Sequence, residues 1–209
     1  MGLWTDRVVP HIVERALSTT DVMTLRRSAC TGLAGRVLEL GFGSGLNVGV
    51  YPAAVTSIDA VEPSDVGWEM SADRRREAAL PIARVGLDGE RLDADDASYD
   101  AVLSTFTLCT IPDVAAALRE VRRVLRPGGA LHFLEHGLSP DASVARWQRR
   151  LDPVERLVAG GCHLSRDIPA LIRVAGLDAV SLEAAYLPGP GVGRPWNYVF
   201  SGRSVSAPA

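Results

Sequence analysis

The sequence contains no lysine, and all 22 of its Lys-plus-Arg positions are arginines. Without a lysine amine, the chain cannot form a Schiff base with a carbonyl substrate or with pyridoxal phosphate. It also lacks the lysine with which a Walker A loop contacts nucleotide phosphates. Function classes that depend on a lysine at the reacting centre are therefore excluded.

Cysteine is also scarce. Cys30, Cys109 and Cys162 are far apart in the sequence, and no Cys-x-x-Cys pair occurs. This spacing predicts neither a metal site nor a disulfide framework, so we expect reduced thiols and a cytoplasmic location. Residues 1–15 lack the long apolar stretch of a signal peptide, and no segment has the length of a transmembrane helix. We therefore expect no stable membrane insertion.

Concentrated positive charge is missing as well. The net charge is −3, and the arginine clusters at residues 74–76 and 122–123 lie among acidic residues on predicted helices. A nucleic-acid-binding protein needs a concentrated basic face, so we expect a small-molecule partner and no nucleic acid. The 209 residues are enough for one sizeable core, and we expect a single domain.

Strand and helix patterns alternate along most of the chain, which predicts a doubly wound α/β fold with a mostly parallel sheet. A short connection between the last two strands predicts that these two are antiparallel. Strands are predicted at residues 36–40, 55–61, 82–86, 99–105, 130–135, 177–185 and 197–202. Helices are predicted at residues 6–17, 21–30, 64–76, 113–125 and 167–176, with one more that starts near residues 46–50 and two helices joined by a turn within 139–166.

A glycine-rich turn follows the first predicted strand. Residues 36–45 read Arg-Val-Leu-Glu-Leu-Gly-Phe-Gly-Ser-Gly, with Glu39 near the strand end and glycines at 41, 43 and 45. Such a turn between a strand and a helix is typical of nucleotide-binding sheets, because glycine lets a ligand approach the backbone. A dinucleotide motif places its third glycine three residues after the second, and here the interval is two. This difference favours S-adenosylmethionine over NAD.

Acidic and polar residues after the next strands extend this predicted cofactor site, because ligands of open α/β sheets bind beyond the carboxyl ends of the strands. Glu62 could accept hydrogen bonds from two ribose hydroxyls, and Asp88 could accept one from the adenine amino group. Simpler interpretations are a solvated strand end for Glu62, a turn residue for Asp88, and a backbone anchor of the glycine turn for Glu39. The predicted cofactor-binding residues are Glu39, Gly41, Gly43, Gly45, Asn47, Glu62, Pro63, Asp88, Gly89, Glu90, Thr105, Phe106 and Leu108.

Five short motifs are spread over the region 34–136. They lie at residues 39–45, 61–63, 88–92, 108–112 and 125–129. Together they resemble the class I S-adenosylmethionine-dependent methyltransferases, in the methyltransferase type 11 group. The resemblance implies a seven-stranded sheet whose last strand is antiparallel. We expect residues 34–136 to form the cofactor-binding core, residues 1–33 an amino-terminal helical cap, and residues 137–203 the acceptor-side helices and terminal strands.

The second half of the chain carries further motifs. Glu135-His136-Gly137, Trp147-Gln148, Leu151-Asp152-Pro153 and Gly-Cys-His-Leu-Ser-Arg at 161–166 are similar to methyltransferase-like proteins that methylate alkyl thiols in animals, and to their bacterial relatives. This similarity implies a thiol acceptor. We expect the chain to depart from the animal proteins in three respects: it would lack their amino-terminal membrane helix, His163 stands where they have Asn, and Glu62 where they usually have Asp.

Methyl transfer from a sulfonium is an in-line displacement, which mainly requires that the reacting atoms be positioned. A thiolate acceptor needs no base, whereas an oxygen or nitrogen acceptor would use one. We predict His136 as that catalytic group and Trp147, His163 and Arg166 as acceptor-side residues, and each of the four also has a structural interpretation. The alternatives are a nicotinamide-dependent oxidoreductase, which the glycine spacing disfavours, and a non-catalytic protein that binds S-adenosylmethionine.

Overall fold

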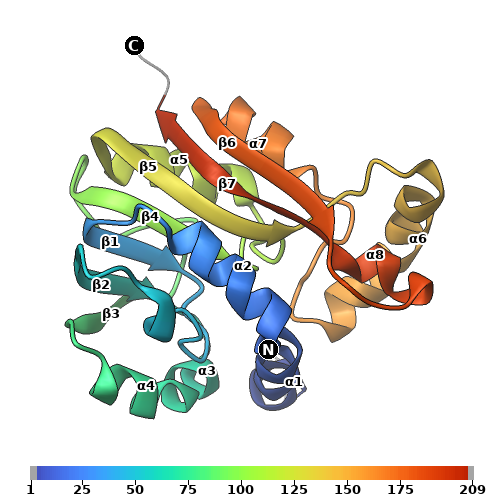
Figure 1. Cartoon of the computed structure of the whole chain (residues 1–209), viewed down its shortest axis with the longest axis horizontal. Coiled ribbons are helices and arrows are strands. Elements are labelled where there is room, and N and C mark those ends of the chain that lie inside the picture. The colour runs from blue at the N-terminus through green and yellow to red at the C-terminus, as the bar shows by residue number, and fades with distance from the viewer. Residues whose placement is uncertain (1–3, 207–209) are drawn as a thin grey trace.

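Seven strands form one sheet in the computed structural model, which describes residues 4–206 (Figure 1). Most of these strands are short apolar runs rich in β-branched residues, a composition that favours extended structure in a buried sheet. The strands are β1 (Gly35–Leu40), β2 (Val55–Val61), β3 (Ile82–Gly86), β4 (Tyr99–Thr105), β5 (Leu125–His136), β6 (Leu177–Tyr186) and β7 (Tyr198–Ser206).

The strand order is β3-β2-β1-β4-β5-β7-β6. The first five strands in this order are parallel, and β7 runs antiparallel to both of its neighbours. The predicted seven-stranded, mostly parallel sheet with an antiparallel last strand is therefore confirmed. The order reverses between β1 and β4, and Leu40 pairs with both Val61 and Ser104. This register brings the carboxyl ends of β1, β2 and β4 to one edge, where such sheets bind ligands.

Helices cover both faces of the sheet, with α2 on one face and α5 and α7 on the other (Figure 1). Each face has its own apolar cluster, because successive strand residues such as Val37 and Leu38 point to opposite sides. Within residues 4–206, no helix is both long and apolar enough to cross a bilayer. The helices are α1 (Val9–Leu17), α2 (Thr20–Cys30), α3 (Asp65–Met70), α4 (Ala72–Glu77), α5 (Val114–Val124), α6 (Ala142–Val158), α7 (Ile168–Val174) and α8 (Arg194–Asn197).

Two helix predictions near the glycine turn are wrong. Residues 46–50 form only a short 3-10 turn, Val48–Val50, because a glycine and two β-branched valines leave this stretch with little helix propensity. Residues 64–76 form α3 and α4 rather than one helix. The break is at Ser71, whose hydroxyl donates to the carbonyl of Trp68 (2.6 Å) and so competes with the helical backbone bonds.

Two boundaries in the second half also differ from the prediction. A single helix, α6, replaces the two helices joined by a turn that are predicted within 139–166, and Pro153 lies inside it. The flanking residues favour helix and offset the lost backbone donor and the steric cost of the proline. Strand β5 begins at Leu125 rather than at residue 130, because residues 126–129 bulge out between two pairs that join β5 to β4. The predicted turn is thus an interruption within the strand.

Candidate functional site

The three glycines after β1 all have positive φ, at 68° for Gly41, 56° for Gly43 and 77° for Gly45. Glycine adopts these conformations without the strain that a side chain would add. A Cβ on Gly41 would also lie 2.0 Å from Thr107 Oγ1, whereas a Cβ on Gly43 would meet nothing within 4 Å. The turn is therefore packed against the protein at Gly41 and open to a ligand at Gly43.

Glu62 lies beside this turn at the carboxyl end of β2, and only 5% of its surface is exposed. One carboxylate oxygen accepts from the N–H of Gly43 (2.6 Å) and the other from the N–H of Ser64 (2.7 Å). Burial raises the pKa of Glu62, and the two backbone bonds oppose that rise. Because each oxygen has two acceptor sites, both keep one for a ligand hydroxyl. Glu62, which precedes Pro63, is therefore not a solvated strand end.

Glu39, Asn47 and Thr105 meet in a buried hydrogen-bond network. Asn47 Nδ2 donates to Glu39 Oε1 (2.8 Å) and to Thr105 Oγ1 (2.9 Å), and the Tyr51 hydroxyl donates to the second Glu39 oxygen. Arg26 of α2 donates to Asn47 Oδ1 (2.9 Å) and to Thr105 Oγ1 (2.8 Å). Sequence reasoning missed Arg26 and Tyr51. Since Glu39 binds side chains, the interpretation that it anchors the backbone of the glycine turn is wrong.

Burial raises the pKa of Glu39 to about 7, against hydrogen bonds from Tyr51 and Asn47 that lower it. In the unfolded chain a glutamate titrates near its ordinary value of about 4.3. Between these two values the folded protein binds the proton more tightly than the unfolded chain, so the free energy of unfolding falls as the pH rises. We expect Glu39→Gln to abolish this loss of stability, which is about 3–4 kcal/mol across the window.

Urea unfolding of the wild type and of Glu39→Gln at several pH values between about 4 and 8 measures this difference. The difference between the free energies of unfolding of the variant and of the wild type should shift steadily in favour of the variant as the pH rises. Glu77→Gln, at the exposed end of α4, controls for the loss of one surface carboxylate. Parallel curves for Glu39→Gln and the wild type would show that Glu39 ionises normally.

Asp88 lies in an exposed turn after β3. Its carboxylate accepts from the N–H of Glu90 (2.8 Å), which agrees with the simpler interpretation of Asp88 as a turn residue. The carboxylate of Glu90 in turn accepts from the N–H of Asp113, which precedes α5 (2.8 Å). A Cβ on Gly89 would lie 3.3 Å from Ile111 Cδ1. The predicted adenine-side residues are therefore neighbours of the loop that follows β4.

Glu135, a fully buried residue of β5, holds the loop after β4. Its carboxylate accepts from Ser104 Oγ (2.7 Å), from the N–H of Thr107 (3.0 Å) and from the N–H of Cys109 (3.3 Å). Phe106, within this loop, has a φ of 55°, a strained value for a residue with a side chain. Backbone strain of this kind is concentrated at functional sites, and Phe106 is one of the predicted cofactor-binding residues.

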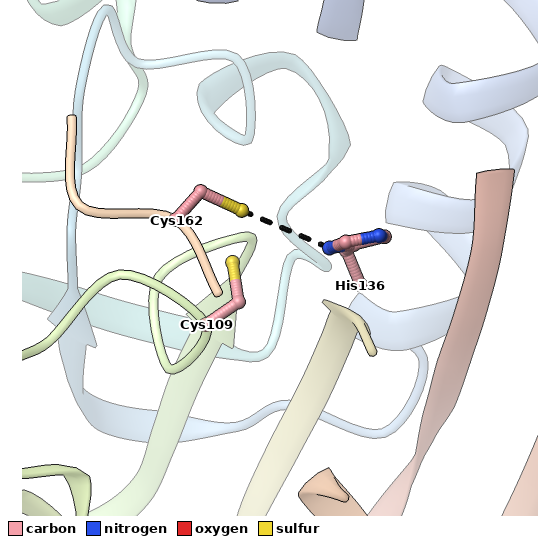
Figure 2. Close-up of side chains that lie close together, drawn as sticks. All are labelled: Cys109, His136 and Cys162. Carbon is pink, nitrogen blue, oxygen red and sulfur yellow. Dashed lines mark hydrogen bonds between the residues drawn. The ribbon is translucent and has the colours of Figure 1, made fainter. Parts of the chain in front are cut away.

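His136, Cys109 and Cys162 lie close together beyond the carboxyl ends of β4 and β5 (Figure 2). Cys162 Sγ is 3.7 Å from His136 Nδ1, and His136 Nε2 is 3.2 Å from the carbonyl oxygen of Pro195. Contacts with Cys109 and His136 lower the pKa of Cys162 despite its burial. The contact with Cys162, together with burial, raises the pKa of Cys109. Burial lowers the pKa of His136, but its contact with Cys162 produces a net rise.

The predicted acceptor-side residues separate into two groups. The backbone N–H of His163 donates to the carbonyl of Cys109 (2.9 Å), and Arg166 Nη1 donates to the carbonyl of Leu108 (2.5 Å). His163 and Arg166 thus tie the segment after α6 to the loop after β4. Trp147 lies on α6 and is 54% exposed. The first two residues lie beside the His136 cluster, whereas Trp147 contacts solvent.

Comparison with known proteins matches residues 38–133 to the methyltransferase domain family. The human thiol S-methyltransferase TMT1B is 37% identical over 160 residues, which cover 73% of this chain and 65% of that protein. The phthiotriol/phenolphthiotriol dimycocerosates methyltransferase of Mycobacterium tuberculosis is 29% identical over 187 residues, covering 78% and 67%. A solved S-adenosylmethionine-dependent methyltransferase from Thermotoga maritima matches with a TM-score of 0.67 at 20% identity, covering 98% of this chain and 99% of that one.

The structural match, at that identity, shows the fold alone. The chain spans 62 to 65% of the length of the thiol S-methyltransferases that it matches. The domain match includes the glycine turn, Glu62, Asp88 and the loop after β4. Residues 38–133 are therefore similar to the methyltransferase domain family, and the predicted resemblance to the class I S-adenosylmethionine-dependent methyltransferases is confirmed.

Proposed function

We propose that the protein transfers the methyl group of S-adenosylmethionine to a small-molecule acceptor by in-line displacement, with a thiol as the favoured acceptor. The observation that carries the proposal is the joint geometry of the glycine turn and Glu62. Gly43 has an open face and a positive φ, and its N–H is bonded to a buried carboxylate at the switch point of the sheet. This arrangement fits an adenosyl group whose ribose lies against Glu62.

The proposed donor site extends from this turn along the edge of the sheet. The predicted cofactor-binding residues that follow β1, β2, β3 and β4 lie at the carboxyl ends of those strands. Asp88 and Gly89 would face the adenine ring, and the strained backbone at Phe106 would lie along the methionine portion. Arg26, which is buried and bonded to Asn47 and Thr105, would fix the side chains around the sulfonium group.

The acceptor assignment rests on the relatives and on chemistry. The animal proteins that the chain matches are named thiol S-methyltransferases. A thiol with a pKa of about 8.5 supplies enough thiolate near neutral pH to attack an activated methyl group without a protein base. His136 already bonds Pro195 through one nitrogen and contacts Cys162 with the other. For an oxygen or nitrogen acceptor, His136 would be the proposed base.

The remaining expectations stand as proposals. We propose that residues 34–136 bind the donor, that residues 1–33 cover it, and that residues 137–203 shape the acceptor side. We also propose that the protein acts in the cytoplasm and binds no nucleic acid. The supporting observations are the net charge of −3 and the three cysteines, none of which is in a disulfide.

Calorimetry with S-adenosylmethionine and S-adenosylhomocysteine tests the donor site, and a nicotinamide fluorescence titration tests the main alternative. We expect micromolar-range binding of both adenosyl compounds and none of the nicotinamide. Mass spectrometry of reactions with alkyl thiols, phenols and amines then tests the acceptor, and we expect methylated thiol. If the protein bound the donor but methylated no acceptor of the three classes, the non-catalytic alternative would be favoured. Absence of binding at millimolar concentration would overturn the proposed function.

A further inference from the structure

Three soft or borderline ligand atoms lie together where the loop after β4, the end of β5 and the segment after α6 meet. The two sulfurs of Cys109 and Cys162 and a ring nitrogen of His136 all lie within 4.8 Å of one another, and no other group of this kind occurs among residues 4–206. Figure 2 shows the side chains directed at a common centre. Tetrahedral zinc, with bonds of about 2.0–2.3 Å, places its sulfur and nitrogen ligands roughly 3.6–3.8 Å apart.

We propose that Cys109, Cys162 and His136 bind one thiophilic divalent cation, for which Zn²⁺ is the best match in ligand type and size. The separation of Cys162 Sγ and His136 Nδ1 is already 3.7 Å. Because the three ligand atoms all lie within 4.8 Å of one another, closure requires the Cys109 sulfur to move by only about 1 Å. This proposal replaces the expectation, drawn from spacing alone, that the chain has no metal site.

The hydrogen bonds around His136 prepare it to act as a ligand. Its Nε2 faces the carbonyl oxygen of Pro195, which can only accept, so Nε2 carries the proton and Nδ1 has a free lone pair. Gln148 donates to the same carbonyl (3.0 Å) and accepts from the N–H of Ser139 (2.9 Å), which fixes the position of the acceptor. Metal-binding histidines commonly have a second nitrogen oriented in this way.

The charges also balance. Two thiolates neutralise a divalent cation, so the loaded site carries no net charge, as its burial requires. Binding would release the two thiol protons to solvent. Glu135 and Arg166 lie beside the cluster with opposite charges: Glu135 accepts from the N–H of Cys109, and Arg166 bonds the carbonyl of the preceding residue.

The backbone already holds the ligands in place. His163, next to Cys162, bonds the carbonyl of Cys109 through its N–H (2.9 Å). Gly160 and Gly161, just before Cys162, have φ values of 63° and 91°, and their conformational freedom allows the segment the small shift that closure needs. Three protein ligands leave a fourth tetrahedral position for water or another small ligand.

Titration with Co²⁺ of the full-length protein, which has first been reduced and stripped of metal, tests this proposal. The titration needs neither the methyl donor nor a methyl acceptor. We expect one equivalent of Co²⁺ to produce sulfur-to-cobalt charge-transfer absorption and tetrahedral d–d bands, and Zn²⁺ to displace it. Cys109→Ala and Cys162→Ala should each lose these bands or bind at least about 100-fold more weakly. Cys30→Ala removes a buried cysteine outside the cluster and should bind like the wild type.

Circular dichroism establishes that each variant is folded, and if Cys109→Ala is not, the partly exposed Cys162 provides the decisive variant. Zn²⁺ should also raise the Tm of the wild type and leave that of Cys162→Ala unchanged. A folded, reduced wild type without cobalt–sulfur bands would overturn the proposal. So would equal loss in Cys30→Ala, or a Cys109–Cys162 disulfide in place of metal in protein purified from zinc-supplied cells. Failure here would leave the proposed methyl transfer intact, because calorimetry measures donor binding separately.

Discussion

Gly41→Ala is expected to lower the Tm by about 6–12 °C, whereas Gly43→Ala lowers it by only about 2–8 °C and abolishes measurable donor binding. Both residues have positive φ, which costs an alanine about 1–2 kcal/mol. At Gly41 the new methyl group would also overlap Thr107, raising the cost to about 3 kcal/mol. At Gly43 it would meet no protein atom and would occupy the space proposed for the donor.

Thermal unfolding and calorimetry with S-adenosylhomocysteine, performed on the same samples, separate these two effects. Gly128→Ala is the matched control, since Gly128 has a φ of 82°, no atom within 4 Å of a Cβ, and a position at the amino-terminal part of β5. It should lose stability like Gly43→Ala and bind the donor like the wild type. If Gly43→Ala bound the donor with unchanged affinity, the glycine turn would not contact the ligand.

Glu62→Ala is expected to raise the Kd for S-adenosylmethionine and for S-adenosylhomocysteine by about 100-fold or more. Hydrogen bonds to a charged acceptor contribute about 1.5–3 kcal/mol each, and Glu62 would accept two from the ribose. The variant also removes the acceptor for the N–H groups of Gly43 and Ser64, so the turn loses an anchor as the ligand loses its contact. Both losses are expected to raise the Kd.

Two further variants make this test specific. Glu62→Asp keeps the carboxylate and should retain binding to within about tenfold. Asp65→Ala removes a carboxylate from the same segment; Asp65 is exposed and pairs with Arg84, and its loss should leave the Kd unchanged. Similar affinities for Glu62→Ala and Asp65→Ala would mean that the ribose hydroxyls do not contact Glu62.

The sheet was predictable because its strands carry local patterns. Runs such as 55–61 and 99–105 are apolar and β-branched, and their observed bounds match the prediction. The errors arose where two local signals competed with each other. The valines after the glycine turn form only a 3-10 turn, and Pro153 lies inside a continuous helix although it suggests a turn. Low helix propensity explains the structure at the first place, and flanking residues that favour helix explain it at the second.

The candidate site was predictable only where it depends on residues near strand ends. The glycine turn and Glu62 follow directly from strands, so their meeting at one edge follows from a parallel sheet. Arg26 reaches Asn47 and Thr105 from a helix far earlier in the chain, and nothing in its neighbouring residues indicates this. Cys109 and Cys162 likewise meet only through tertiary structure, which no spacing rule for metal ligands describes.

The position of β7 between β5 and β6 constrains how the chain is made. A ribosome releases residues in order, and β6 has no strand partner among residues 4–206 other than β7. The sheet is therefore incomplete, with an unsatisfied edge on β5, until residues 198–206 have left the exit tunnel. Nascent chains arrested before this point should be sensitive to proteases and should recruit chaperones, whereas chains that extend well past it should be resistant.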